Sequence, residues 1–427
     1  MKLHKIKTIL AVAAMGVLSQ SCLDLDPKDQ LAESNLWSSP SDFQLFANQF
    51  YGWTRDFGSL DNNSVKPLHS DYNSDLFTSR DDRNRFSNGS NSVQESDGNY
   101  GSCYAHIRRT NLLLQNAEKY SASADIAQYV GEAHFFRAYS YFDLLEAEKC
   151  LQNDPIQNVV PYMIRTSTSA GDVVDKAAKD EMDKYVARVN LYSVKAMLAR
   201  AYQSRGEYVA AVSKAKKVID GGKFRLLEAT SIDQSENMVD LLFSDEHIFS
   251  LRNKELSTYT KSIFKETSGG TTALRMEGSY NLYDGNQDDF RYSKWYVDFD
   301  FIKYVPDSNS IFTTKVPLIK LSEMYLLIAE CTYDTDPDEA RRYVNMLRRH
   351  RIRGNQEGAG DWMYLSREDI FKEMRREYIG EGQMWFAHKR NRLNLSGGLT
   401  GTIEASDDIF VFPLPDAEIE SGNRNER

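Results

Sequence analysis

Residues 196–218 read AMLARAYQSRGEYVAAVSKAKKV, and this stretch decides the fold. Large and small apolar residues recur at helical spacing on both sides of Gly206. Ala199 and Ala211 are small enough to let two helices approach closely, and the neighbouring tyrosines fill the space that remains. The stretch therefore predicts two antiparallel helices that pack face to face.

A second stretch has the same design. Its apolar positions are Leu321, Met324, Leu327, Ile328 and Cys331, followed after a turn by Ala340, Val344 and Leu347. Asp336 and Pro337 form a good helix start, because the carboxylate caps free amides and proline is preorganised for the first helical position. Both stretches match the tetratricopeptide pattern of helix pairs, and further pairs are expected within 104–149 and 176–205.

Two irregular regions interrupt the helical pattern, roughly 61–100 and 229–316. We expect a mostly α fold, in which tetratricopeptide-like repeats over roughly 104–222 and 317–352 form an α-α superhelix. With the irregular regions they are predicted to form one domain, 22–427.

The helix expected from about 128 to 149 is apolar on nearly every side, so it should be central and buried. Arg137 lies within it. An isolated buried charge is costly, so we interpret Arg137 as a member of a structural ion pair and not as a ligand contact.

The N-terminus predicts export. Three lysines precede the apolar run Thr8–Leu18, which is too short to cross a bilayer, since a spanning helix needs about 20 residues. Residues 1–21 are therefore expected to be a signal peptide that is removed.

The sequence LSQSC, ending at Cys22, resembles a lipobox, in which the cysteine becomes the acylated first residue. The acidic stretch LDLDP that follows resembles the signal for export to the cell surface in Bacteroidetes. We expect Cys22 to anchor the chain in the outer membrane, facing the exterior. The alternative is a plain secreted protein in which Cys22 is structural.

The chain is acidic, with 52 Lys and Arg against 62 Asp and Glu and a formal net charge of −10. Nucleic-acid binding depends on Lys and Arg that neutralise phosphates, so a nucleic-acid partner is not expected. Aromatic residues make up 12% of the chain, with tyrosine the commonest at 24. Such rings suit both protein cores and sugar-binding surfaces.

Beyond Cys22 the cysteines are Cys103, Cys150 and Cys331, an odd number that rules out a disulfide framework. Their spacing does not fit zinc, so we expect buried or idle thiols and no metal. Whether any two of them form a disulfide is left open.

Catalytic signatures are missing from the sequence: there is no G-x-S-x-G, H-E-x-x-H, phosphate loop or dinucleotide fingerprint. The acidic pairs Asp71/Asp75 and Asp288/Asp289 resemble the carboxylates of a glycosidase, but solvated loop charge or a structural calcium ion is the simpler interpretation. We predict that the protein is not an enzyme, with no catalytic residues and no cofactor apart from such a calcium ion.

Several segments, in the same order along the chain, resemble the SusD/RagB family of outer-membrane nutrient-binding lipoproteins of Bacteroidetes. They are Tyr104–Asn111, Gly131–Leu144 (GEAHFFRAYSYFDL), Ala196–Tyr202, Lys320–Glu330 (KLSEMYLLIAE), Glu373–Arg390 and Phe412–Pro415. Met374 and Met384 stand where the family prefers Arg, and Ala387 where it prefers Asp. An ion pair replaced by apolar contacts would give this pattern, and such a swap is often neutral in energy.

The resemblance implies a scaffold seated on a SusC-like TonB-dependent transporter, where it captures oligosaccharides for import. One alternative is a RagB-type protein that takes up peptides. Another is a helical-repeat scaffold that binds protein segments and imports nothing.

We predict ligand contacts from both irregular regions: Asp71, Tyr72 and Arg80 from the first, and Tyr283, Trp295 and Tyr296 from the second. Sugar rings stack on aromatic faces, while Asp and Arg bind hydroxyl groups. Trp295 and Tyr296 are the leading choice, and the alternative is that they pack the loop onto the helices. Both cannot stack on one ligand if that stretch is extended, because neighbouring residues of a strand point to opposite faces.

Overall fold

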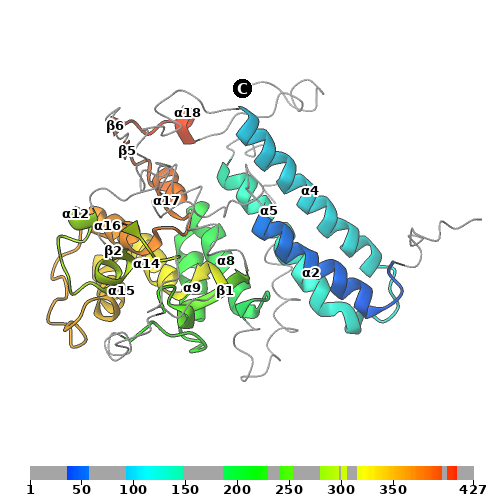
Figure 1. Ribbon diagram of the computed structural model, residues 1–427, viewed down its shortest axis with the longest axis horizontal. Helices are drawn as coiled ribbons and strands as arrows, with labels where there is room; N and C mark the ends of the chain where they lie inside the picture. The colour runs from blue at the N-terminus through cyan, green and yellow to red at the C-terminus, as the bar shows by residue number, and fades with distance from the viewer. Residues whose placement is uncertain are drawn as a thin grey trace, which may run out of the picture.

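The computed structural model describes residues 36–56, 93–147, 186–228, 240–252, 279–297, 300–304, 315–396 and 402–410. Within these ranges helices predominate and the strands are short (Figure 1). The mostly α fold that the sequence predicts is confirmed. No helix within the described ranges is long and apolar enough to span a membrane.

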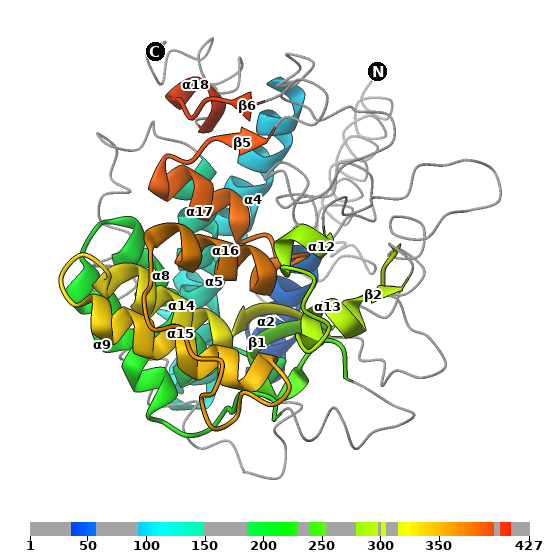
Figure 2. The same ribbon diagram turned by 90° about the vertical axis from the view of Figure 1, so that its left-hand side faces the viewer.

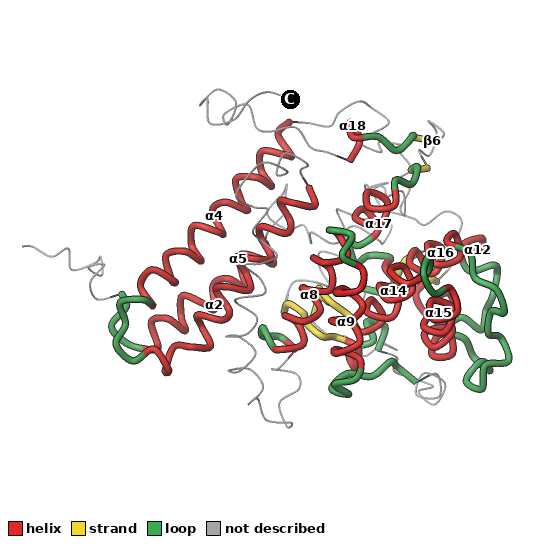
Figure 3. The backbone as a smooth tube through the Cα atoms, turned by 180° about the vertical axis from the view of Figure 1, so that it is seen from behind, coloured by secondary structure: helices red, strands yellow, loops and turns green. Residues whose placement is uncertain are grey.

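Helices α2 (Pro40–Asp56), α4 (Val93–Ala117) and α5 (Ala127–Ala147) pack together at one side of the molecule (Figures 1 and 3). A short 3-10 turn, η2 (Ser123–Ile126), leads into α5. Side chains from several faces of α5 are buried, including those of Ala133, Phe136 and Leu144. The prediction of a buried helix is therefore confirmed, and α5 is central to this three-helix group and not to the whole molecule.

Arg137 on α5 is partly buried and reaches α4. Its guanidinium donates a hydrogen bond to Asn111 Oδ1 at 2.6 Å and lies 3.3 Å from His134 Nδ1. Burial lowers the pKa of Arg137 to about 10, so it stays charged at neutral pH. Through these contacts Arg137 joins α5 to α4; both partners are uncharged groups, and the predicted ion pair stays a prediction.

The first repeat consists of α8 (Leu191–Ser204) and α9 (Tyr208–Ile219). Asn190 caps α8, since its side chain accepts hydrogen bonds from the amides of Tyr192 and Ser193. Ala199 and Ala211 are fully buried, as close packing of two helices requires. This helix pair confirms the prediction from residues 196–218.

The second repeat consists of α14 (Leu321–Thr332) and α15 (Pro337–Arg351). The Asp336 carboxylate accepts a hydrogen bond from the amide of Glu339 at 2.9 Å, and Pro337 takes the first helical position. Both the helix pair and its predicted cap are confirmed. Helix α14 also packs on α9, so the two repeats are stacked (Figure 2).

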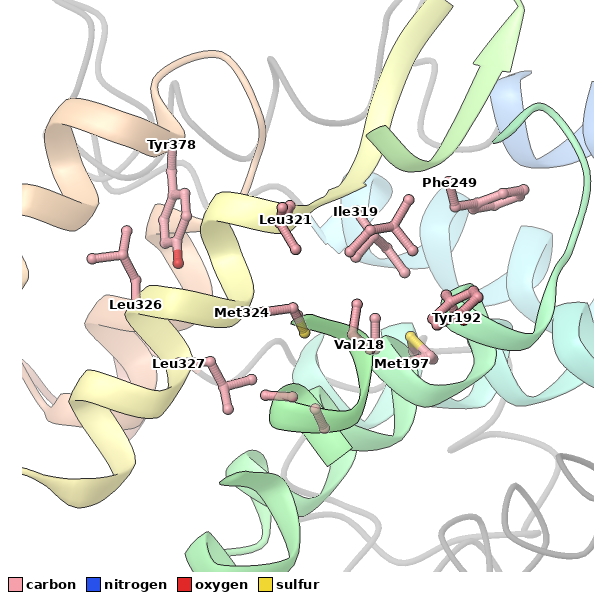
Figure 4. Packing of buried hydrophobic residues seen from close by; sticks show 14 of the residues in the cluster. Tyr192, Met197, Val218, Phe249, Ile319, Leu321, Met324, Leu326, Leu327 and Tyr378 are labelled. Atoms are coloured by element: carbon pink, nitrogen blue, oxygen red, sulfur yellow. The ribbon is translucent and has the colours of Figure 1, made fainter. Parts of the chain in front are cut away.

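The centre of the repeats is apolar. Figure 4 shows side chains of α8 and α9 meeting those of α14, with Met197 and Val218 on one side and Met324 and Leu327 on the other. Phe249, from strand β1, belongs to the same core. Burial of such side chains stabilises the fold by about 1.5–3 kcal/mol each.

Strand β1 (His247–Arg252) follows the turn η6 (Ser244–Glu246) and pairs antiparallel with β4 (Lys315–Lys320). Strand β4 runs directly into α14, so this two-stranded sheet is continuous with the second repeat. The remaining pairs are β2 (Tyr296–Val297) with β3 (Asp300–Phe301), and β5 (Leu395–Ser396) with β6 (Thr402–Ile403).

The other helices are α12 (Ser279–Leu282), α13 (Phe290–Trp295), α16 (Arg367–Tyr378), α17 (Met384–Asn391) and α18 (Asp407–Phe410). Met374, Met384 and Ala387 on α16 and α17 are buried among apolar neighbours. This is the environment in which an ion pair can be exchanged for apolar contacts. Cys103 and Cys331 are buried, and Cys150 lies outside the described residues.

Candidate functional site

Within the second irregular region the structure describes α12 and α13, which the sequence did not distinguish from extended chain. The Asp289 side chain caps α13 by accepting a hydrogen bond from the Arg291 amide at 3.0 Å. Six residues of helix then pass directly into β2. Trp295 and Tyr296 lie at this junction, and their side chains have different surroundings.

Trp295 points into the core and is 0% exposed. Its indole Nε1 donates a hydrogen bond to the Leu241 carbonyl at 2.8 Å. Phe243 packs on the indole at 5.3 Å, and the Lys303 ammonium lies 4.2 Å from the ring centre. No ring face is left for a sugar, so the predicted ligand contact at Trp295 is corrected: this tryptophan packs the loop onto the helices.

Tyr283 is also part of the interior, at 1% exposed. Its hydroxyl donates a hydrogen bond to the Arg376 carbonyl at 3.0 Å. The predicted direct ligand contact at Tyr283 is therefore corrected as well. Tyr283 instead supports its neighbour Tyr292, whose ring is stacked on it at 5.5 Å.

Tyr296 is half-buried, and its ring contacts Tyr283, Tyr292 and Phe301 at centroid distances of 6.1, 6.2 and 5.5 Å. With Tyr304, which is buried beyond Phe301, these residues form what we call the tyrosine cluster: Tyr283, Tyr292, Tyr296, Phe301 and Tyr304. Tyr292 and Tyr296 are its partly exposed members. They are the rings of this cluster that keep some solvent exposure.

Tyr292 was missed by the sequence reasoning. It lies in α13, four residues before Tyr296, which begins β2, and the two rings meet where the helix passes into the strand. No spacing rule for a single helix or strand finds this pair. Burial raises the pKa of both Tyr283 and Tyr296 well above the ordinary range, so their hydroxyls remain protonated and able to donate.

A buried network of charges lies beneath the cluster. Its centre is Arg291, whose guanidinium contacts Asp289 at 2.7 Å, Glu373 at 2.8 Å and Glu377 at 3.1 Å. Arg351 continues the network, with contacts to Glu377 at 2.8 Å and to Glu246 at 2.7 Å. These ion pairs join α13, α15 and α16 to the turn before β1.

Two lysines extend the network toward Trp295. Lys320 contacts Glu377 at 3.1 Å and Glu381 at 2.7 Å, and Lys303 contacts Glu381 at 2.6 Å. Gly380, the residue directly before Glu381, has φ +77°, a left-handed conformation that glycine adopts without strain. We define the ionic network by these residues: Glu246, Asp289, Arg291, Lys303, Lys320, Arg351, Glu373, Glu377 and Glu381.

The network carboxylates are suited to structure and not to proton transfer. Cations lower the pKa of Glu373 to about 2 and hold that of Glu377 well below its ordinary range, in spite of burial. A glycosidase needs one carboxyl group with a raised pKa as its general acid. Glu373 and Glu377 stay ionised at neutral pH and hold the tyrosine cluster in place.

Asp288 and Asp289 have separate roles. Asp288 is 58% exposed and lies 3.7 Å from Arg353, whereas Asp289 is buried and bound to Arg291. The two carboxylates therefore do not share a cleft. No group of three His, Cys, Asp or Glu side chains gathers as metal ligands would in the part of the chain that the structure describes.

The remaining predicted positions lie outside the described residues: the anchor Cys22, the contacts Asp71, Tyr72 and Arg80, and Asp75. A separate polar cavity between α8, α14 and α17 is lined by Arg200, Gln203, Glu330 and Arg390. Its volume is about 20 Å³, enough for about one water molecule. It is too small to hold a sugar ring.

A family model described as "Starch-binding associating with outer membrane" matches residues 22–208, and the model of the SusD family matches residues 248–421. No curated protein matches the sequence.

Similar solved structures include two SusD superfamily proteins. The one from Bacteroides thetaiotaomicron has a TM-score of 0.68 and 19% identity, covering 90% of this chain and 98% of that chain. The one from Bacteroides fragilis has a TM-score of 0.68 and 17% identity, with the same coverage of 90% and 98%.

A third similar structure is surface glycan-binding protein A from Bacteroides thetaiotaomicron in complex with laminarihexaose. It has a TM-score of 0.68 and 14% identity, covering 90% of this chain and 99% of that chain. At such identities the likeness shows the fold. Together with the two family models, it establishes that this chain belongs to the SusD family of glycan-binding, outer-membrane-associated proteins.

Proposed function

We propose that this chain is a surface lipoprotein that captures oligosaccharides and delivers them to a SusC-like TonB-dependent transporter. The observation that carries the proposal is the tyrosine cluster, in which Tyr292 and Tyr296 are partly exposed above a rigid ionic network. A ligand that binds there needs no ordering of these rings, which reduces the entropic cost of binding.

The chemistry of the cluster favours a sugar. A tyrosine ring offers an apolar face to the C–H groups of a sugar and a hydroxyl to its oxygens. The complex of surface glycan-binding protein A with laminarihexaose, in a protein of the same fold, supports the same ligand class. Asp71, Tyr72 and Arg80 remain proposed contacts from the first irregular region.

The state of two buried carboxylates supports binding without hydrolysis. Glu373 and Glu377 are bound by cations and lack the raised pKa of a general acid. We therefore propose that the chain is not an enzyme. We also propose that acylated Cys22 holds it at the outer face of the outer membrane.

The test is binding of the mature chain to arrays of glycans and peptides, followed by titration of the best ligand. Tyr292→Ala and Tyr296→Ala are each expected to weaken oligosaccharide binding about tenfold, which corresponds to about 1.4 kcal/mol. Tyr208→Ala is the matched control, because Tyr208 is an exposed tyrosine on α9, away from the cluster. Unchanged affinity in both cluster variants would contradict the assignment of the site.

Two further measurements test the rest of the proposal. Incubation with the bound oligosaccharide should release no reducing ends, and their release would mean that the chain is a hydrolase. Peptide binding in place of glycan binding would favour the RagB-type alternative.

Cys22→Ala should move the protein from the membrane to the soluble fraction, and acylation that persists in this variant would refute the anchor.

A further inference from the structure

The turn between α12 and α13 has an unusual backbone. Asp284 has φ +54°, and Gly285 directly after it has φ +66°. Glycine adopts this left-handed conformation freely, whereas other residues disfavour it, aspartate less than most. Asp284 is one of three residues other than glycine with a positive φ in the described part of the chain. A backbone of this kind persists where contacts from the surrounding structure hold it in place.

Helix α16, which lies beside α12, supplies those contacts (Figure 2). The Asp284 carboxylate lies 2.5 Å from the Lys372 ammonium and 2.6 Å from the Arg376 guanidinium. Arg376 also donates a hydrogen bond to the Leu282 carbonyl at 2.7 Å. It therefore binds the chain on both sides of Tyr283. We call Asp284, Lys372 and Arg376 the clamp.

Tyr283 is the residue that the clamp encloses. Its hydroxyl donates to the Arg376 carbonyl at 3.0 Å, and its ring lies 5.8 Å from the Arg291 guanidinium and 6.0 Å from that of Arg376. Tyr292 stacks on this ring at 5.5 Å with an angle of 19° between the planes. The clamp thus reaches a partly exposed ring of the candidate site through one buried side chain.

The exposed end of the clamp contributes more to position than to stability. Asp284 is 62% exposed, and an exposed ion pair adds little to the free energy of unfolding. Arg376 is buried and also contacts Glu373 of the ionic network at 3.1 Å. Removing the Asp284 charge should therefore leave the fold intact and loosen the turn that carries Tyr283.

We infer that Asp284 is a positioning residue of the candidate sugar site: its charge fixes the turn that carries Tyr283, and Tyr283 holds Tyr292 in the orientation that stacks on a sugar. The inference rests on the proposed function, because it assigns Asp284 to the same site. Asp284 acts before binding and needs no contact with the sugar. A Tyr292 ring that has to be ordered during binding should weaken affinity about two- to tenfold.

The experiment is a double-mutant cycle on the full mature chain. Affinity is measured by calorimetric titration with the oligosaccharide that binds tightest on the glycan array. Asp284→Asn keeps the size of the side chain and a residue that tolerates left-handed backbone, but it removes the charge. This variant should bind about two- to tenfold more weakly than the wild type. In the Tyr292→Ala background it should have no further effect, because the ring that Asp284 positions is gone.

Asp334→Asn is the matched control. Asp334 is 69% exposed and pairs with Arg367, at the other end of α16. The control therefore removes an ion pair of the same kind, with the same helix, at a distance from Tyr283. Its affinity should equal that of the wild type, and both Asn variants should melt at nearly the wild-type temperature.

The outcomes separate the inference from the proposed function. If Tyr292→Ala weakens binding and Asp284→Asn does not, Asp284 does not position the site, while the proposed function stands. Losses that add in the double variant would mean that Asp284 acts on the sugar independently of Tyr292, and an equal loss in Asp334→Asn would assign the effect to general charge removal; either result overturns the inference. If the wild type binds no oligosaccharide, or Tyr292→Ala binds as tightly as the wild type, the proposed site fails and the inference fails with it.

Discussion

The two stacked repeats and the ionic network are both buried, but different interactions hold them. Helices α8 and α9 meet through small residues such as Ala199 and Ala211, with apolar neighbours from α14 around them. Helices α13, α15 and α16 meet through charges, and Glu373, Glu377 and Glu381 each contact at least two cations.

The two kinds of interaction differ in how strictly they fix the positions of the residues that make them. Apolar packing tolerates swaps that keep volume, so one repeat can be rebuilt in many ways. A buried carboxylate shared between cations requires each partner at a fixed distance and direction, and loss of one partner leaves an uncompensated charge. The ionic network thus fixes the position of the tyrosine cluster, whereas the repeats supply a stable body.

The largest expected effect is at the centre of the network. Glu377→Gln removes the charge that Arg291, Arg351 and Lys320 share, and should lower the free energy of unfolding by about 3–5 kcal/mol. Urea denaturation followed by circular dichroism measures it. Glu368→Gln, at an exposed position of the same helix, is the control and should change stability by less than about 0.5 kcal/mol. Equal effects of the two variants would remove the distinction between the network and ordinary surface charge.

A second effect is a loss of stability in acid. The pKa of Glu373 is lowered to about 2 in the folded chain, against an ordinary value of 4.5. A carboxyl group with a lowered folded pKa contributes stability above its unfolded pKa, and that contribution is lost as the pH falls through the folded pKa. Between about pH 4.5 and 2 the free energy of unfolding should fall by about 3 kcal/mol for this group alone.

The readout for acid destabilisation is the urea midpoint measured at steps of pH. Glu373→Gln provides the control, because it removes this titrating group and should make the fall between pH 4.5 and 2 smaller, while Glu377 still contributes to it. A wild-type midpoint that stays constant over this window would mean that Glu373 is not held ionised by Arg291 and its neighbours.

More of the fold than of the candidate site could be predicted from the sequence. The helix pairs at 191–219 and 321–351 follow from local periodicity, as does the cap at Asp336, since their signals lie within a few residues of one another. The ionic network could not be found in this way. Arg291 and Glu377 are 86 positions apart, and only the tertiary fold brings them together.

The candidate site shows the same limit. From the composition of the second irregular region we predicted that its aromatic side chains contact a ligand, and the tyrosine cluster brings several of them together. Composition does not say which face of the chain turns inward, so buried Trp295 was chosen and partly exposed Tyr292 was missed. The short helix α13 makes that difference, because it rotates Trp295 toward Leu241 and leaves Tyr296 beside Tyr292.

The smallest effect tests the apolar side of the comparison. Ala211 is fully buried where α9 meets its neighbours, so Ala211→Leu adds methylene groups to a packed core and should lower the free energy of unfolding by about 1–3 kcal/mol. Val209→Leu adds a methylene on the exposed face of the same helix and should leave the urea midpoint within error. Because apolar packing carries no charge, the loss caused by Ala211→Leu should be the same at pH 7 and at pH 4. A loss that grew in acid would mean that the repeats depend on the ionic network and that the two regions are not energetically separate.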